Sequence, residues 1–309
     1  MTLGLELTFL PRKQPAGLPS GPKIDTLVAR FNKALDKRVN GQEYAACDFR
    51  AKSERLGLFG CIIEVVHRER FISDLSSGGS SLKDQLDGVF SIARDLDLVA
   101  RSSFRRKGVL MLRPNGGSHL HHSIDVFKHG ADFLPRLTAF QQALFTSYAN
   151  RPYIRWLFAH PFDDLNSSVT YNLAELNQKP RMGIVEKMHE CPWVAYEGAP
   201  GILARFGGAR VTVLPTFEHR YFDATADTKE TLANLRFLKA WINSVVGTTD
   251  VNRPRQLTIT PEYFKRLKNL RFAWQEISVF LCSLGLDPAD YRAIFERNYV
   301  TRMKWGKML

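Results

Sequence analysis

The chain has 309 residues, enough for one large domain or two average ones. Apolar residues make up 44% of it and charged residues 24%, which excludes a mostly disordered chain, a collagen-like fibre and a disulfide scaffold. With 43 Lys and Arg against 31 Asp and Glu, the formal net charge is +12. This charge predicts an anionic ligand or an anionic macromolecule as partner, although a basic surface with no specific partner explains it equally well.

The four cysteines form no CxxC pair, so we expect reduced, buried thiols. The N-terminal segment has no basic stretch followed by a long apolar one, and no apolar run approaches about 18 residues. These features predict a cytoplasmic protein without a membrane span.

Hydrophobic periodicity predicts the elements of the first half of the chain. Leu5, Leu7 and Phe9 alternate with Glu6 and Thr8, which is typical of a strand. In chain order we predict a strand at 3–10, a loop at 11–23, a helix at 24–37, a strand at 58–66, a loop at 73–81 and a helix at 82–100.

In the second half, strands and helices again occur in hairpins and pairs instead of strict βαβ units. We predict strands at 109–112 and 119–126, helices at 132–148 and 154–158, a turn-rich segment at 160–200, a strand at 211–222 interrupted at Pro215, a helix at 228–246, a loop at 247–258 and two or three helices over 261–299. This order favours an α+β fold with a mainly antiparallel sheet over a doubly wound parallel sheet. Neither GxxxxGK[ST] nor GxGxxG follows a strand.

Four short strand segments carry ionisable residues between apolar ones. A charge inside a strand costs free energy unless it is paired or bound to a metal ion. The residues are Glu6 in the first segment, Glu64 in the second, His119, His121 and His122 in the third, and Glu218, Arg220 and Asp223 in the fourth.

The spacing of these residues favours a shared site. Residues i and i+2 of a strand share a face, so His119, His121 and Ser123 lie together, as do Glu218 and Arg220. Carboxylates and imidazole suit Mg²⁺ or Mn²⁺, and Arg supplies a fixed charge for phosphate. Alternatives remain: salt bridges for the lone glutamates, a polar cluster or structural zinc site for the histidines, and a cross-strand ion pair for Glu218 with Arg220.

Taken in order, the four segments resemble the amidoligase branch of the glutamine synthetase and γ-glutamylcysteine synthetase superfamily of carboxylate–amine ligases. Residues 4–9 are similar to its G-x-E-x-E-F motif, 64–67 to E-[LIV]-[LIV]-S, 117–123 to G-x-H-x-H-x-S, and 218–225 to E-[FH]-R-x-x-D-[GA]-T. The resemblance spans residues 1–246, which we therefore predict to be a ligase-like catalytic domain. Residues 247–309 are predicted to be a helical extension packed on the same domain.

The resemblance implies a curved antiparallel sheet with helices outside, and an ATP-dependent ligase that activates a carboxylate as an acyl phosphate for attack by an amine. It also implies bacterial or phage relatives. The implied roles are metal binding by Glu6, Glu64, His119 and Glu218, contact with ATP by His121, Ser123 and Arg220, and catalysis by Arg220 and Glu218. The cofactors would be ATP and Mg²⁺ or Mn²⁺, and the substrates a small or peptide-like carboxylate and an amine.

Two residues depart from the family pattern. Thr8 stands where the family usually has a second carboxylate, and His67 replaces a small hydroxyl residue. Two other functions therefore stay open: a metal-dependent nuclease or hydrolase that uses the histidine cluster, and a non-catalytic relative that binds nucleic acid.

Overall fold

The structure is a computed structural model of the 309-residue chain. It describes residues 3–12, 21–41, 49–55, 61–67, 79–100, 117–123, 194–195, 209–211, 216–223, 225–247 and 260–304, with single residues between 143 and 157. The predicted strand at 109–112 lies outside this part, as does nearly all of the segment 160–200. The predicted helices at 132–148 and 154–158 are described only at single residues.

The chain divides into two compact units. Residues 2–122 and 222–232 form the first, which we call the N-terminal unit, and residue 1 with 123–221 and 233–309 forms the second, the C-terminal unit. The strand β8 (Thr216–Asp223) and the helix α8 (Thr228–Gly247) contribute residues to both units. The boundary expected at residue 246 stays a prediction.

An antiparallel sheet forms the centre of the N-terminal unit. Its strands lie in the order β2–β3–β1–β5, and β4 pairs with the end of β1. They are β1 (Leu3–Pro11), β2 (Phe49–Arg55), β3 (Cys61–His67), β4 (Leu98–Ala100) and β5 (Gly117–Ser123). With its helices, this sheet confirms the predicted α+β class and the antiparallel pairing.

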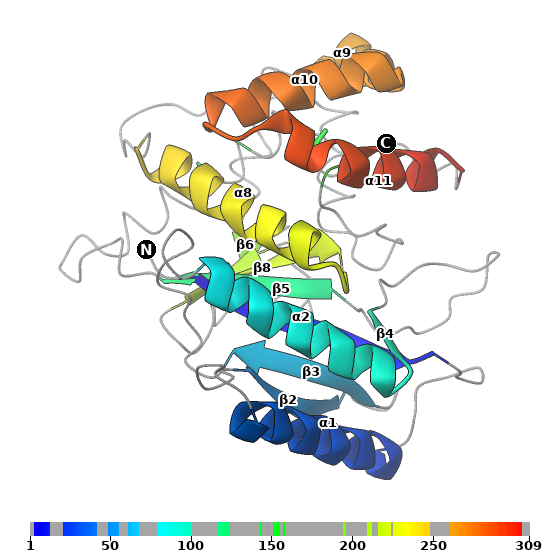
Figure 1. The fold of residues 1–309 in the computed structure, drawn as a ribbon. Coiled ribbons are helices and arrows are strands. Elements are labelled where there is room, and N and C mark those ends of the chain that lie inside the picture. The colour runs from blue at the N-terminus through cyan, green and yellow to red at the C-terminus, as the bar shows by residue number, and fades with distance from the viewer. Residues whose placement is uncertain are drawn as a thin grey trace. The chain divides into compact units, whose positions relative to one another are not determined.

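One face of this sheet is apolar and packs on two helices, α1 (Gly21–Gly41) and α2 (Gly79–Asp95) (Figure 1). Phe9 of β1 is fully buried, and its ring centroid lies 6.2 Å from those of both Phe31 in α1 and Phe90 in α2. Because strand side chains alternate, Glu6 and Thr8 project from the opposite face of β1. The helical face therefore holds the core, and the other face carries the candidate site.

The edge strand β2 was not predicted. Its sequence, FRAKSER, offers only Phe49 and Ala51 as apolar positions, which is too weak a pattern to identify a strand. Asn32 of α1 fixes its free edge: the side-chain amide donates to the carbonyl of Ala51 and accepts from its N–H, both at 2.9 Å. β2 pairs with β3 along its whole length, and Asn32 satisfies the backbone groups of Ala51 on the opposite edge.

The helix predicted at 82–100 is wrong at its C-terminal end. The helix α2 ends at Asp95, and residues 98–100 form β4, which pairs with Phe9–Pro11. Asp97, between them, has φ of 53°, a left-handed conformation that an α-helix cannot continue through. Its carbonyl accepts from the N–H of Arg12 at 2.8 Å, so the reversal is fixed against β1. The start of α1 at Gly21 likewise shortens the loop predicted at 11–23.

The described part of the C-terminal unit contains short strands, most of β8 and the C-terminal helices. The strand predicted at 211–222 is divided into β7 (Ala209–Val211) and β8, which pair antiparallel, and β6 (Val194–Ala195) runs parallel to β7. The helix predicted at 228–246 is confirmed as α8. The further helices are α9 (Pro261–Arg266), α10 (Leu270–Ser283), the short 3-10 helix η4 (Pro288–Tyr291) and α11 (Arg292–Lys304).

Aromatic residues hold these helices together. Phe237 of α8 contacts Phe280 of α10, with ring centroids 6.1 Å apart. The buried Tyr291 donates from its hydroxyl to the carbonyl of Ala233 at 3.0 Å, and this bond joins η4 to α8. In the described part of the chain, no helix combines the length and the apolar character needed to cross a bilayer.

Candidate metal centre

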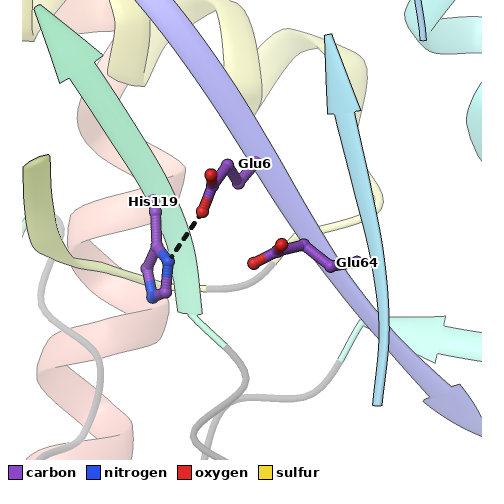
Figure 2. A group of neighbouring side chains, drawn as sticks. All are labelled: Glu6, Glu64 and His119. Carbon is purple, nitrogen blue, oxygen red and sulfur yellow. Dashed lines mark hydrogen bonds and ion pairs between the residues drawn. The ribbon is translucent and has the colours of Figure 1, made fainter. Parts of the chain in front are cut away.

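Glu6 and His119 form the centre of the candidate site. They are direct cross-strand partners on β1 and β5, so their side chains leave the same face of the sheet. Nδ1 of His119 lies 3.1 Å from Oε2 of Glu6, and with the ring proton on Nδ1 the imidazole donates to the carboxylate. Figure 2 shows this contact as a dashed line.

Glu64 joins this pair from β3. Its register partner on β1 is Thr8, two residues from Glu6, so both glutamates occupy one face. One ligand atom from each of Glu6, Glu64 and His119 lies within 4.8 Å of the others. In Figure 2 the polar ends of the three side chains point toward one another. The structure thus brings together three of the four predicted metal ligands, while their role in binding metal stays a prediction.

The other histidines of β5 divide between the two faces as expected. Nε2 of His121 lies 3.4 Å from Oε1 of Glu6, on the same face as His119. His122 points the opposite way and is 1% exposed. Burial and the neighbouring His121 lower the pKa of His122 to about 3, so it is neutral in the folded chain.

The two glutamates have opposite electrostatic environments. Burial alone would raise the pKa of Glu6, but its contacts with His119 and His121 bring that pKa well below its usual value. For Glu64, burial raises the pKa to about 8, and the negative charge of Glu6 adds to this effect. A metal-free Glu64 therefore holds its proton more strongly than an ordinary carboxyl group, and a bound cation would oppose that effect.

Sequence reasoning missed Lys52, which forms an ion pair with Glu64. It lies directly opposite Glu64 on β2, and its Nζ is 2.6 Å from Oε2. The alternation of Arg50, Lys52 and Glu54 with Phe49 and Ala51 was the available signal, but it falls on the strand that was not predicted.

The donor set fits a hard divalent cation. Two carboxylates and an imidazole suit Mg²⁺ or Mn²⁺, with the imidazole favouring Mn²⁺. Glu64 is 3% exposed, and a buried carboxylate needs a cationic partner. A metal ion held by both Glu6 and His119 would replace the hydrogen bond between them.

The remaining predicted site residues have side chains outside the described part. Ser123 lies at the end of β5, and Glu218 and Arg220 lie in β8, as predicted from their strand patterns. Their backbone positions are described, but their side chains are not. The roles expected for Ser123, Glu218 and Arg220 therefore stay predictions.

Comparison with known proteins assigns no family. No family model matches the chain, and no curated protein matches it. Among solved structures, the chain is similar to one described as "Apo GmaS without ligand", with 16% sequence identity over 100% of this chain and 70% of that chain, at a TM-score of 0.42. A likeness at this TM-score carries no argument about function, so the interpretation rests on the strands and side chains described above.

Proposed function

We propose that this chain is an ATP- and divalent-metal-dependent carboxylate–amine ligase. The observation that carries the proposal is the convergence of Glu6, Glu64 and His119, three residues from distant parts of the sequence, on one face of an antiparallel sheet. These residues belong to three of the four segments whose order resembles the amidoligases. The resemblance supplies the reaction class, and the convergence supports a shared site.

The predicted site residues would divide the work of the reaction. Glu6, Glu64 and His119 would hold the divalent ion, with Glu218 as a further ligand. A bound divalent ion supplies positive charge that neutralises the phosphate oxygens. His121 and Ser123 would face the nucleotide, and Arg220 would bind the transferring phosphoryl group, because its planar guanidinium matches the phosphate oxygens.

The proposed reaction has two steps. A substrate carboxylate oxygen attacks the γ-phosphorus of ATP, so ADP leaves and an acyl phosphate forms. The nitrogen of the amine then attacks the acyl carbon and loses a proton, and inorganic phosphate leaves. The products are an amide, ADP and phosphate, so cleavage of ATP makes amide formation favourable.

Thermal unfolding with nucleotide and metal tests this proposal. We expect a non-hydrolysable ATP analogue to stabilise the chain only when Mg²⁺ or Mn²⁺ is present, by about 2.7 kcal/mol at a hundredfold excess over Kd. Glu64→Gln should abolish most of this stabilisation. Asp84→Asn removes one carboxylate charge from the exposed surface of α2, and it should leave the stabilisation unchanged. A stabilised chain should then be screened for release of ADP with mixtures of amines and carboxylates.

Other outcomes favour the two alternatives. Metal-dependent stabilisation without any effect of nucleotide, together with cleavage of nucleic acid, would favour a metal-dependent nuclease or hydrolase. Binding of nucleic acid that weakens steeply with salt, without ATP cleavage, would favour the non-catalytic relative. Either result would contradict the ligase proposal.

A further inference from the structure

Lys52 contacts the carboxyl group of Glu64, one of the candidate metal ligands. Its Nζ is 2.6 Å from Oε2 of Glu64, and the Lys52 side chain is 53% exposed whereas that of Glu64 is 4% exposed. The lysine thus reaches a buried carboxylate from the solvent side of the edge strand. An ammonium group and a metal ion are both attracted to the same carboxylate oxygen, so they compete for it.

The backbone holds Lys52 in this place. The two residues before it contact α1: Ala51 exchanges two hydrogen bonds with Asn32, and Arg50 pairs with Asp36 at 2.7 Å. Register with β3 fixes Lys52 directly opposite Glu64. The Cα of Lys52 is therefore fixed, while its long, half-exposed side chain can turn away into water without disturbing the strand.

We propose that Lys52 is a built-in cation that competes with the divalent ion for Glu64 and thereby sets the metal affinity of the site. The inference rests on the metal site of the proposed function. In the metal-free chain the ammonium group compensates the charge of Glu64 whenever that residue is ionised. When a divalent ion binds, the Lys52–Glu64 ion pair breaks and the ammonium group moves toward solvent, because two cations on one oxygen repel each other.

A second ion pair provides a matched control. Lys83 and Asp87 of α2 pair at the same distance, 2.6 Å, and Lys83 is 52% exposed, almost the same as Lys52. The difference lies in the acid: Asp87 is 48% exposed and belongs to a helix surface, whereas Glu64 is buried in the candidate site. A change that follows from removing any surface lysine should appear at both positions.

The test is a calorimetric titration of the metal-free chain with Mn²⁺ under argon at pH 8.5, above the pKa of about 8 for Glu64. We expect Lys52→Met to bind Mn²⁺ roughly three- to tenfold more tightly than the unaltered chain, the range of a half-exposed ion pair. We expect Lys83→Met to bind Mn²⁺ with unchanged affinity. Equal or weaker binding by Lys52→Met would overturn the inference.

Acylation of lysines gives a second readout. It uses only the unaltered chain, so it does not depend on whether a variant folds. An amine-acylating reagent followed by mass spectrometry measures the reactivity of each lysine. Saturating Mn²⁺ should raise the reactivity of Lys52 severalfold and leave that of Lys83 unchanged. If the chain binds Mn²⁺ and the reactivity of Lys52 stays the same, the inference fails while the proposed function stands.

The two proposals can fail separately. If the unaltered chain binds no Mn²⁺, both the metal site and the role of Lys52 are wrong. If Lys52 competes with Mn²⁺ but the chain forms no amide from an amine and a carboxylate with cleavage of ATP, the inference stands and the ligase proposal fails.

Discussion

Thr8 and Glu64 lie directly opposite each other on β1 and β3, and both are almost completely buried. Thr8 stands where the amidoligases, which the sequence resembles, usually have a second carboxylate, so this chain places a neutral hydroxyl beside Glu64. Lys52 faces Glu64 from the other neighbouring strand. The cross-strand row Lys52–Glu64–Thr8 therefore holds one carboxyl group, and Lys52 balances its charge when that group is ionised.

Replacing Thr8 with glutamate should make the metal-free chain less stable and bind metal more tightly. The new carboxylate would be buried beside Glu64, and an uncompensated buried charge costs on the order of 3 kcal/mol. A divalent ion would bind both carboxylates and recover that loss. The measurement is thermal unfolding of the Thr8→Glu variant in EDTA and in Mn²⁺.

Thr8→Val is the matched control, because it keeps the branched shape without adding a charge. We expect the gap between the melting temperatures in Mn²⁺ and in EDTA to widen for Thr8→Glu and not for Thr8→Val. A gap that stays the same in both variants would show that position 8 does not face the metal.

The stability of the metal-free chain should carry a pH dependence from Glu64. Burial raises the pKa of Glu64 from 4.5 to about 8, so in this window the folded chain keeps a proton that the unfolded chain has released. This contribution to stability is complete below pH 4.5 and is lost as the pH rises through 8. Urea unfolding in EDTA between pH 5 and 8 should show a free energy of unfolding that falls, relative to Glu64→Gln, as the pH rises. A constant difference between the two proteins would contradict the raised pKa.

His122 should give the opposite pH dependence. Burial lowers its pKa from 6.5 to about 3, so between these values the unfolded chain binds a proton that the folded chain does not. Stability from this residue is complete above pH 6.5 and falls by about 1.4 kcal/mol per pH unit on acidification. Relative to His122→Gln, the unaltered chain should lose stability between pH 6.5 and 4.5 in urea unfolding. Parallel curves for the two proteins would mean that His122 protonates in the folded state.

Asn32→Ala should destabilise the chain by about 1–3 kcal/mol, because it leaves the N–H and carbonyl of Ala51 without their side-chain partner. Asn243→Ala, at an exposed position of α8, controls for the better helix propensity of alanine and should change stability by only a few tenths of a kcal/mol. Chemical denaturation measures both. Equal changes in the free energy of unfolding for the two substitutions would mean that the hydrogen bonds of Asn32 make no net contribution to stability.

Elements with a strong hydrophobic period could be predicted from the sequence. The alternation around Leu5, Leu7 and Phe9 identified β1, and helical spacing identified α8, because in both cases one face is almost wholly buried. The end of α2 could not be predicted in this way. Apolar residues continue into β4, and the break depends on the left-handed backbone of Asp97, a tertiary feature fixed by Arg12.

The candidate site likewise contains residues that could be predicted from the sequence and one that could not. Glu6 and Glu64 could be identified because each is an ionisable residue within an apolar strand, and His119 because it alternates with His121 and Ser123 on one face of a strand. Lys52 could not be identified, because four of the seven residues of its strand are charged and a lysine on an edge strand is ordinary. Lys52 is a candidate site residue because the pairing of β2 with β3 places it opposite Glu64. This pairing cannot be read from the sequence.

The most direct test of the metal site is a crystal of this chain soaked in Mn²⁺, with anomalous diffraction measured at the manganese absorption edge. We expect a strong anomalous peak within about 2.5 Å of oxygens of Glu6 and Glu64 and of a ring nitrogen of His119. An anomalous map that shows Mn²⁺ bound at other positions of the chain, and no peak between these three side chains, would contradict the proposed metal site.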